Sequence, residues 1–239
     1  DPAHQALGHV LLERPLDEET LALLRQGPMD GDGDVGPRDG HHRGEHREPP
    51  PSPDEETLRR SEDSFIDEIF SAAPEYGAPL LRALFPRAYL DVNREAFELD
   101  PGMFADSLPQ HVNTASLRAA GGLGTIARVV ADGKNIYREK LSYAEAERRI
   151  GALYRPYHAT LDGLLADAEG ACGVAVLIDC HSMPSQGAPL PGPDPRPAEI
   201  ILGDRFGASC APLISEIVES TLRDLGYRVE RNNPYAGGH

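Results

Sequence analysis

The chain has 239 residues, which is enough for one large domain or two small ones. Hydrophobic residues make up 40% of it, so a buried core can form, although the chain contains no Trp. The 39 Asp and Glu residues outnumber the 23 Lys and Arg residues, and the formal charge is −16. This acidity argues against nucleic acid or an anionic membrane as the main partner.

The cysteines and the apolar runs indicate the compartment. Cys172, Cys180 and Cys210 are too few and too irregularly spaced for a disulfide framework, and a Cys-x₂-Cys zinc pattern is absent. We expect reduced thiols, with a packed or near-site role for Cys180 favoured over a nucleophilic one. No apolar run approaches the ~18 residues of a membrane span, and the first residues lack a signal-peptide pattern. A cytoplasmic location is the default expectation.

The first 55 residues differ in composition from the rest. Residues 1–26 contain a short helical pattern. Residues 27–55 consist mainly of Gly, Asp, Arg, His and Pro, so they bury too little apolar surface to fold and are predicted to be a disordered linker. Their histidines, His41, His42 and His46, favour solvation over metal binding. Such a composition also arises when a GC-rich gene is read out of frame, a hypothesis that resequencing would test.

An α/β domain is predicted from residue 56 to residue 239. Its first element is a helix over residues 57–73, where Asp63 and Asp67 lie one turn apart and share a face. Both are candidate carboxylate ligands for a metal, although a solvated helix face is the more common role of such residues.

A short strand is predicted at residues 88–92, and it leads into Asn93-Arg94. Arg94 is suited to holding a substrate carboxylate in a bidentate manner. An ion pair with Asp91 or Glu95 is the alternative, and the sequence leaves both open. The Gly-rich stretch at residues 121–124 is interpreted as a turn, because no Lys-Ser/Thr follows it as in a phosphate loop.

The second half of the chain alternates between helical and strand patterns, which indicates an α/β sheet. The expected elements are a helix at 143–169 that Pro156 kinks or breaks, strands at 173–178, 199–202 and 227–230, a Pro-rich flap at 187–197, and a helix at 210–225 with Gly226 as its cap.

The strand at residues 173–178 leads into Asp179-Cys180-His181-Ser182. Ligands of open α/β sheets bind outside the carboxyl ends of the strands, so these polar side chains are expected at a binding edge. His181 could bind a metal or move a proton there. Asp179 could orient a metal ligand or cap the following turn. His158, on the preceding helix, is either a ligand-binding residue or a structural histidine, and the second is more common.

Several motifs, in this order, resemble the N-formylglutamate amidohydrolase family. They are Leu58-Arg59-Arg60-Ser61-Glu62-Asp63 through Phe70, Pro86 to Arg94, Glu98-Leu99-Asp100-Pro101, Gly122-Leu123-Gly124, Pro156-Tyr157-His158, Asp179 to Pro184, Gly203-Asp204-Arg205-Phe206-Gly207 and Asn233-Pro234-Tyr235-Ala236-Gly237-Gly238. The likeness extends from about residue 56 to the end of the chain.

The resemblance implies a zinc-carboxypeptidase-like α/β fold of three layers, with a mixed, mostly parallel sheet and helices on both faces. It implies zinc-dependent removal of an N-acyl group, such as formyl, from an acidic amino acid. By the same likeness, His181 and Asp63 would bind zinc. Asn93 and Arg94 would hold the substrate carboxylate, with Ser182 and His158 also in the substrate site and Asp179 behind the metal ligand.

Two departures from the family bear on activity. The family has a Pro-His-Ser-Gly motif at the place where this chain has the Gly-, Arg-, His- and Pro-rich segment of residues 27–55. The family also continues to a Gln-x-Glu motif beyond the position of residue 239. No catalytic residue is therefore assigned, and we expect a chain with impaired zinc binding and little activity. The alternatives are a non-catalytic module that binds a carboxylate ligand, and an unrelated α/β domain in which the motifs are structural. In each case the expected partner is a small molecule.

Overall fold

The structure is a computed structural model, and it forms two compact units, Asp1–Asp179 and Cys180–His239. The residues that it describes are 58, 61–130, 133–183 and 197–237. The expected helix within residues 1–26, the linker at 27–55 with the domain boundary after it, and the flap up to residue 196 lie outside the described residues.

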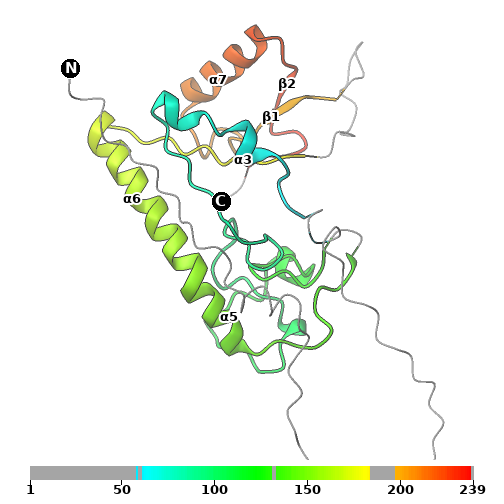
Figure 1. The fold of residues 1–239 in the computed structure, drawn as a ribbon. Coiled ribbons are helices and arrows are strands. Elements are labelled where there is room, and N and C mark those ends of the chain that lie inside the picture. Colours follow the sequence, from blue (N-terminus) through cyan, green and yellow to red (C-terminus); the bar gives the residue numbers. More distant parts are fainter. Residues whose placement is uncertain (1–57, 59–60, 131–132, 184–196, 238–239) are drawn as a thin grey trace, which may run out of the picture. The chain divides into compact units, whose positions relative to one another are not determined.

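The first unit is built around one long helix and a set of short turns (Figure 1). Its elements are α3 (Ile66–Ile69), the 3₁₀ helices η2 (Ala73–Tyr76) and η3 (Pro101–Met103), α4 (Leu117–Ala120), α5 (Tyr143–Arg149), the π-helix η5 (Ile150–Tyr154) and α6 (Arg155–Cys172). Among the described residues, no helix combines the length and the apolar content needed to cross a bilayer.

The predicted helix at residues 143–169 is confirmed as the continuous run of α5, η5 and α6. The Ser142 side chain accepts the backbone N–H of Glu145 and so caps its start. Pro156 lies in the first turn of α6, directly after the π-helix, and does not interrupt the run. A π-turn breaks the regular hydrogen-bond pattern, which fits the position of a residue that has no N–H to donate. Gly173 ends the run with a positive φ of 74°.

The core of the first unit comes mainly from loops that pack on the start of this helix. Its buried members are Tyr89, Leu90, Leu99, Met103, Phe104, Val112, Ile126, Ala146 and Ile150. None of the residues of α6 is buried, so the helix is anchored through α5 and η5. This arrangement fixes the loop before Asn93 against the helix.

The expected helix at residues 57–73 is wrong in extent, because within the described residues 61–73 only α3 is α-helical. Phe65, directly before α3, has a positive φ of 65°, a backbone geometry that no α-helix continues through. Phe65 and Ile69, two members of the supposed apolar stripe, are 68% and 67% exposed. An isolated short helix that buries no apolar face gains too little free energy to persist.

The predicted strand at residues 88–92 is also wrong, because this stretch forms turns. Its residues are nevertheless buried, with Tyr89 and Leu90 only 2% and 1% exposed. The Tyr89 N–H donates to the carbonyl of Pro86 within the turn, at 2.9 Å. Apolar side chains at these positions therefore reflect burial in the core, which a weak alternation in the sequence does not distinguish from a strand.

The apolar run at residues 173–178 is not a strand in the described part of the chain. It is drawn as an extended trace after α6 in Figure 1. Val174, Val176, Leu177 and Ile178 are between 49% and 68% exposed. No backbone ladder to other described residues includes this run. A strand needs a neighbour to satisfy its backbone groups, so an apolar β-type sequence alone does not define one.

The second unit contains a parallel pair of strands joined by a helix. β1 (Ile200–Leu202) pairs with β2 (Val229–Arg231), and Ile200 lies opposite Val229. The connecting helix is α7 (Pro212–Asp224), and Gly226 follows it with a φ of 94°. These elements confirm the expected strand-helix-strand pattern of an α/β unit, with strand limits shifted by one or two residues.

Candidate functional site

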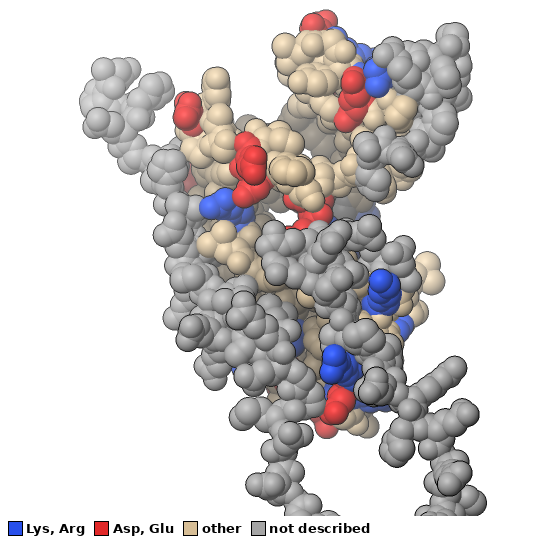
Figure 2. Space-filling model, turned by 45° about the vertical axis from the view of Figure 1, so that its right-hand side comes forward, with Lys and Arg blue, Asp and Glu red and all other residues tan. Residues whose placement is uncertain are grey.

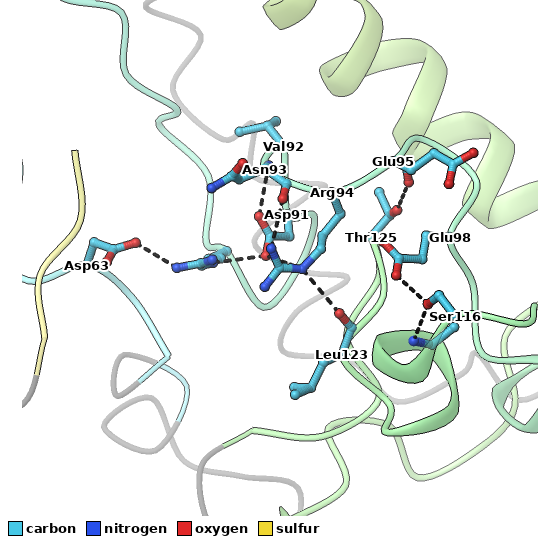
Figure 3. A network of polar contacts seen from close by, with 12 residues as sticks. Asp63, Asp91, Val92, Asn93, Arg94, Glu95, Glu98, Ser116, Leu123 and Thr125 are labelled. Carbon is cyan, nitrogen blue, oxygen red and sulfur yellow. Dashed lines mark hydrogen bonds and ion pairs between the residues drawn. The ribbon is translucent and has the colours of Figure 1, made fainter. Parts of the chain in front are cut away.

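The loop that carries Asn93 and Arg94 is fixed at its start by Asp91, which is 7% exposed (Figure 3). The Asp91 Oδ1 accepts the backbone N–H of Asn93 at 2.9 Å, and its Oδ2 accepts the Nε–H of Arg87 at 3.0 Å. A short carboxylate that binds a backbone N–H two residues ahead is a common way to stabilise a turn. The sequence thus sets the direction of this loop locally.

Two side chains from the long helix hold the same loop from the other side. The Tyr154 hydroxyl donates to the carbonyl oxygen of Arg94 at 2.7 Å, and the His158 Nε2 lies 2.9 Å from the carbonyl oxygen of Val92. A carbonyl oxygen only accepts, so this Nε2 carries a proton and donates. The two rings stack with centroids 4.2 Å apart. His158 therefore has a structural bond, and only its Nδ1 remains for a ligand.

The tyrosines on this helix stay protonated at neutral pH. Burial raises the pKa of Tyr154 above its ordinary value, and the negative charges of Glu95 and Asp91 raise it further. Burial likewise raises the pKa of Tyr157, together with the nearby charge of Asp179. Tyr154 is therefore a permanent donor to the loop.

The Arg94 guanidinium is held partly by the backbone. Its Nη1 donates to the carbonyl oxygen of Asn93 at 2.8 Å, and its Nε lies 3.4 Å from the carbonyl oxygen of Leu123. The same Nε lies 3.5 Å from the Asp91 Oδ2, so the ion pair that the sequence left open is formed. The Asn93 Nδ2 donates to the Asp179 Oδ2 at 2.8 Å. The fold thus brings together Asn93, Arg94 and Asp179, which are 86 residues apart at the extremes.

Asp63 precedes α3 in the sequence and forms an ion pair within the first unit. Its Oδ2 accepts the Nη1–H of Arg87 at 2.7 Å, and both side chains are largely shielded from solvent. Asp67 instead forms an exposed ion pair with Arg82 at 3.0 Å. The two aspartates therefore do not share one helix face as expected, because Asp63 precedes α3 and the positive φ of Phe65 separates it from Asp67.

Arg87 is the residue of this cluster that sequence reasoning did not single out. Burial alone would lower its pKa, but the carboxylates of Asp91, Asp63 and Asp179 outweigh that effect and raise it above the ordinary value. Arg87 is therefore permanently charged. The only signal in the sequence is its spacing of four residues from Asp91, because the contact with Asp63 joins residues 24 positions apart.

The remaining predicted site residues, His181 and Ser182, belong to the second unit and are exposed. In the described part of the chain, no group of three or more His, Cys, Asp and Glu side chains is arranged to hold a metal ion. A catalytic zinc needs three protein ligands and an open position. The described residues therefore do not form a complete zinc site by themselves.

The arrangement of the first unit is suited to binding an anion. Arg87 and Arg94 both contact the Asp91 carboxylate, which also accepts the backbone N–H of Asn93. No hydrogen bond between described residues uses the Nη2 of Arg94. A guanidinium with unused N–H groups in a partly buried place can hold a carboxylate.

Comparison with known proteins adds the family. The sequence profile described as N-formylglutamate amidohydrolase matches residues 37–239. The chain belongs to the N-formylglutamate amidohydrolase family. The family match begins nearer to the N-terminus than the motifs quoted above, which begin at residue 58.

Individual members of the N-formylglutamate amidohydrolase family agree with this assignment. The chain is 29% identical to the N-formylglutamate deformylase of Pseudomonas aeruginosa and 28% identical to that of Pseudomonas putida, in each case over 74% of this chain and 61% of the relative. It also resembles the crystal structure of N-formylglutamate amidohydrolase from Ralstonia eutropha JMP134, with a TM-score of 0.69 and 38% identity. That match covers 76% of this chain and 65% of the other. The chain thus spans about three fifths of the length of these curated relatives.

Proposed function

We propose that this protein binds N-formylglutamate, or a closely related N-acyl derivative of an acidic amino acid, and hydrolyses its amide bond. Two curated relatives are N-formylglutamate deformylases, which supports the reaction class. The observation in the structure that supports it most is the Asn93-Arg94 loop, where a guanidinium whose Nη2 forms no hydrogen bond with other described residues lies next to a buried carboxylate.

The reaction needs a water molecule and a proton. Water adds to the formyl carbon, the bond between that carbon and the amide nitrogen breaks, and the nitrogen takes up a proton, which leaves formate and the free amino acid. Arg94 binds the α-carboxylate of the substrate through its free N–H groups. Asn93, tied to Asp179, supports the same end of the substrate. Both residues act by orienting the amide, which contributes to the rate by fixing the reacting atoms in place.

We further propose that zinc is the cofactor and that His181 and Asp63 contribute ligands to it. Zinc supplies an activated water and polarises the amide carbonyl when it is bound. Two observations support weak binding by this chain. Asp63 already forms an ion pair with Arg87, and the described residues lack a three-ligand group. We therefore expect substoichiometric zinc and turnover well below that of a family member with a complete zinc site.

The test uses the purified full chain, with and without added zinc. Formate released from N-formyl-L-glutamate is measured with a coupled dehydrogenase assay, and bound zinc by mass spectrometry. We expect slow formate release that rises with added zinc, and less than one zinc per chain. Stoichiometric zinc with fast turnover would contradict the proposed impairment, whereas neither binding nor hydrolysis at saturating zinc would contradict the function itself.

Arg94 is tested by substitution. Arg94→Ala removes a charge-assisted contact to the substrate carboxylate, so KM is expected to rise roughly 10- to 100-fold. The matched control is Arg82→Ala, which removes an exposed ion pair and should leave KM unchanged. A KM of Arg94→Ala equal to that of the unaltered chain would exclude this residue as the anchor. Calorimetric binding of N-formylglutamate without formate release would favour the binding module over the hydrolase.

A further inference from the structure

The Arg94 guanidinium has two nitrogens, Nε and Nη1, in contact with the protein and a third, Nη2, on its open side. Nη1 and Nε lie within reach of the carbonyl oxygens of Asn93 and Leu123, and Nε also faces the Asp91 carboxylate. The Nη2 forms no hydrogen bond with other described residues, and 20% of the side chain is exposed. The direction of the open Nη2 side therefore depends on the contacts of Nε and Nη1.

Asp91 is the charged group among the partners of Nε and Nη1. Its Oδ2 is shared by the Nε groups of Arg87 and Arg94, at 3.0 and 3.5 Å, and its Oδ1 holds the backbone of Asn93. One buried carboxylate therefore orients two guanidiniums and the turn between them. Figure 3 shows Asp91 beside Asn93 and Arg94.

The charge of Asp91 is needed as well as its shape. Two guanidiniums on one oxygen atom repel each other, and in a partly buried place this repulsion is weakly screened. A carboxylate between them removes most of that cost, whereas an amide of the same shape would not. Removing one partner from such a group leaves the other charges uncompensated.

We propose that Asp91 is a positioning residue for substrate binding: it holds the Arg94 guanidinium so that its open Nη2 side faces the carboxylate of the substrate. This proposal deepens the proposed function and rests on it for the identity of the ligand. Asp91 itself does not touch the substrate. Its effect is therefore on the binding of the carboxylate and not on the bond that breaks.

The first test compares Asp91→Asn with Asp100→Asn. Asp100 is a matched control, because it is equally buried at 7% exposed and also accepts one backbone N–H and one arginine Nε–H, from Gly102 and Arg128. We expect Asp91→Asn to raise KM for N-formyl-L-glutamate roughly 10- to 100-fold with kcat within about threefold, and Asp100→Asn to leave both unchanged. An unchanged KM in Asp91→Asn, or an equal rise in both variants, would overturn the proposal.

The second test does not depend on turnover. Phenylglyoxal modifies accessible arginines, and the rate at Arg94 is measured by peptide mass spectrometry. We expect faster modification of Arg94 in Asp91→Asn than in the unaltered chain or in Asp100→Asn. Equal rates would overturn the positioning role. If the unaltered chain neither binds nor hydrolyses N-formylglutamate, the proposed function fails, and this measurement still decides whether Asp91 fixes Arg94.

A conservative variant covers the case in which Asp91→Asn does not fold. Asp91→Glu keeps the charge and displaces it by one methylene. We expect an intermediate KM with kcat preserved, and an Arg94 modification rate between those of the unaltered chain and Asp91→Asn. A KM and a modification rate equal to those of the unaltered chain would show that the position of the charge is irrelevant, and this result would overturn the proposal.

Discussion

A single buried guanidinium, that of Arg149, joins the helix to the core. Arg149 is 4% exposed, and its Nε pairs with Glu145 at 2.7 Å. Its Nη1 donates to the Tyr89 carbonyl and the Tyr137 hydroxyl, and its guanidinium lies over the Tyr89 ring with 3.9 Å to the centroid. Buried charges of this kind are tolerated only when they are paired and hydrogen-bonded.

Arg149→Ala is expected to destabilise the protein by about 3–5 kcal/mol, because it leaves Glu145 and Tyr137 without a buried partner. The measurement is urea unfolding followed by circular dichroism. Arg148→Ala is the matched control. Arg148 pairs with the same Glu145 and donates to the Tyr89 hydroxyl at 2.9 Å, but its side chain is 47% exposed, so its loss should cost less than the loss of Arg149. Equal costs for the two variants would contradict the special role of burial.

Glu145 makes part of the stability depend on pH. Burial alone would raise its pKa, but hydrogen bonds from Arg148 and Arg149 outweigh it, and the pKa is lowered in the folded protein. Its contribution is therefore present above the unfolded pKa of about 4.3 and is lost as the pH falls through the lower folded value.

The sign of this effect gives a test with Glu145→Gln. Between about pH 5 and pH 3, the unaltered chain should lose more free energy of unfolding than Glu145→Gln, since the amide has no proton to take up. Near pH 7, the variant should be the less stable of the two. Urea unfolding at a series of pH values measures both. Parallel curves over the acidic range would contradict the lowered pKa.

At the scale of elements, the extended run after α6 differs most from its sequence pattern. Residues 173–178 have the composition of a buried strand but are exposed and form no ladder with other described residues. By contrast, α6 is a complete hydrogen-bonded helix that ends at Gly173. No hydrogen bond between described residues includes the amides of residues 174–177, and backbone amides without hydrogen bonds exchange with solvent at the rates of an open chain.

Hydrogen exchange followed by mass spectrometry tests this difference. Peptides that cover residues 174–177 are expected to exchange within the first time points, whereas peptides from the middle of α6 should stay protected by at least about tenfold. The α6 peptides serve as the internal control for folding. Strong protection at residues 174–177 would show that the run is paired in solution and that the sequence pattern was the better guide.

At the scale of the whole molecule, the sequence predicts elements better than it predicts contacts. The long helix, β1, α7 and β2 follow from local signals such as the Ser142 cap, the helical repeat of apolar residues and Gly226. The turns at residues 88–92 do not follow from local signals, because a distant residue helps to hold them in place. The Thr125 carbonyl accepts the Asp91 N–H at 2.8 Å. The same applies to the pair of Asp63 and Arg87, since no local pattern joins residues so far apart.

The net charge of −16 is likewise a property of the whole chain, and its distribution is not evident from composition. On the face drawn in Figure 2, acidic and basic side chains of the described residues occur in small separate groups among uncharged ones. Many of the arginines of the first unit are instead paired inside it, as with Arg87, Arg128 and Arg149. These cationic side chains thus pair with carboxylates of the same unit.

The π-helix η5 sets the rotational phase of the long helix. Each residue of an α-helix advances by about 100°, so one residue more or fewer before α6 would turn its side chains to another direction. Arg149 precedes η5, Tyr154 ends it and His158 follows, and all three donate to carbonyls of the segment that leads to Arg94. A regular α-helix of the same length would not direct these three side chains to the backbone of the single segment 89–94. The wider turn therefore works as an angular adjustment, and deleting a single residue from it would disengage the loop that carries Arg94 without altering any residue of that loop.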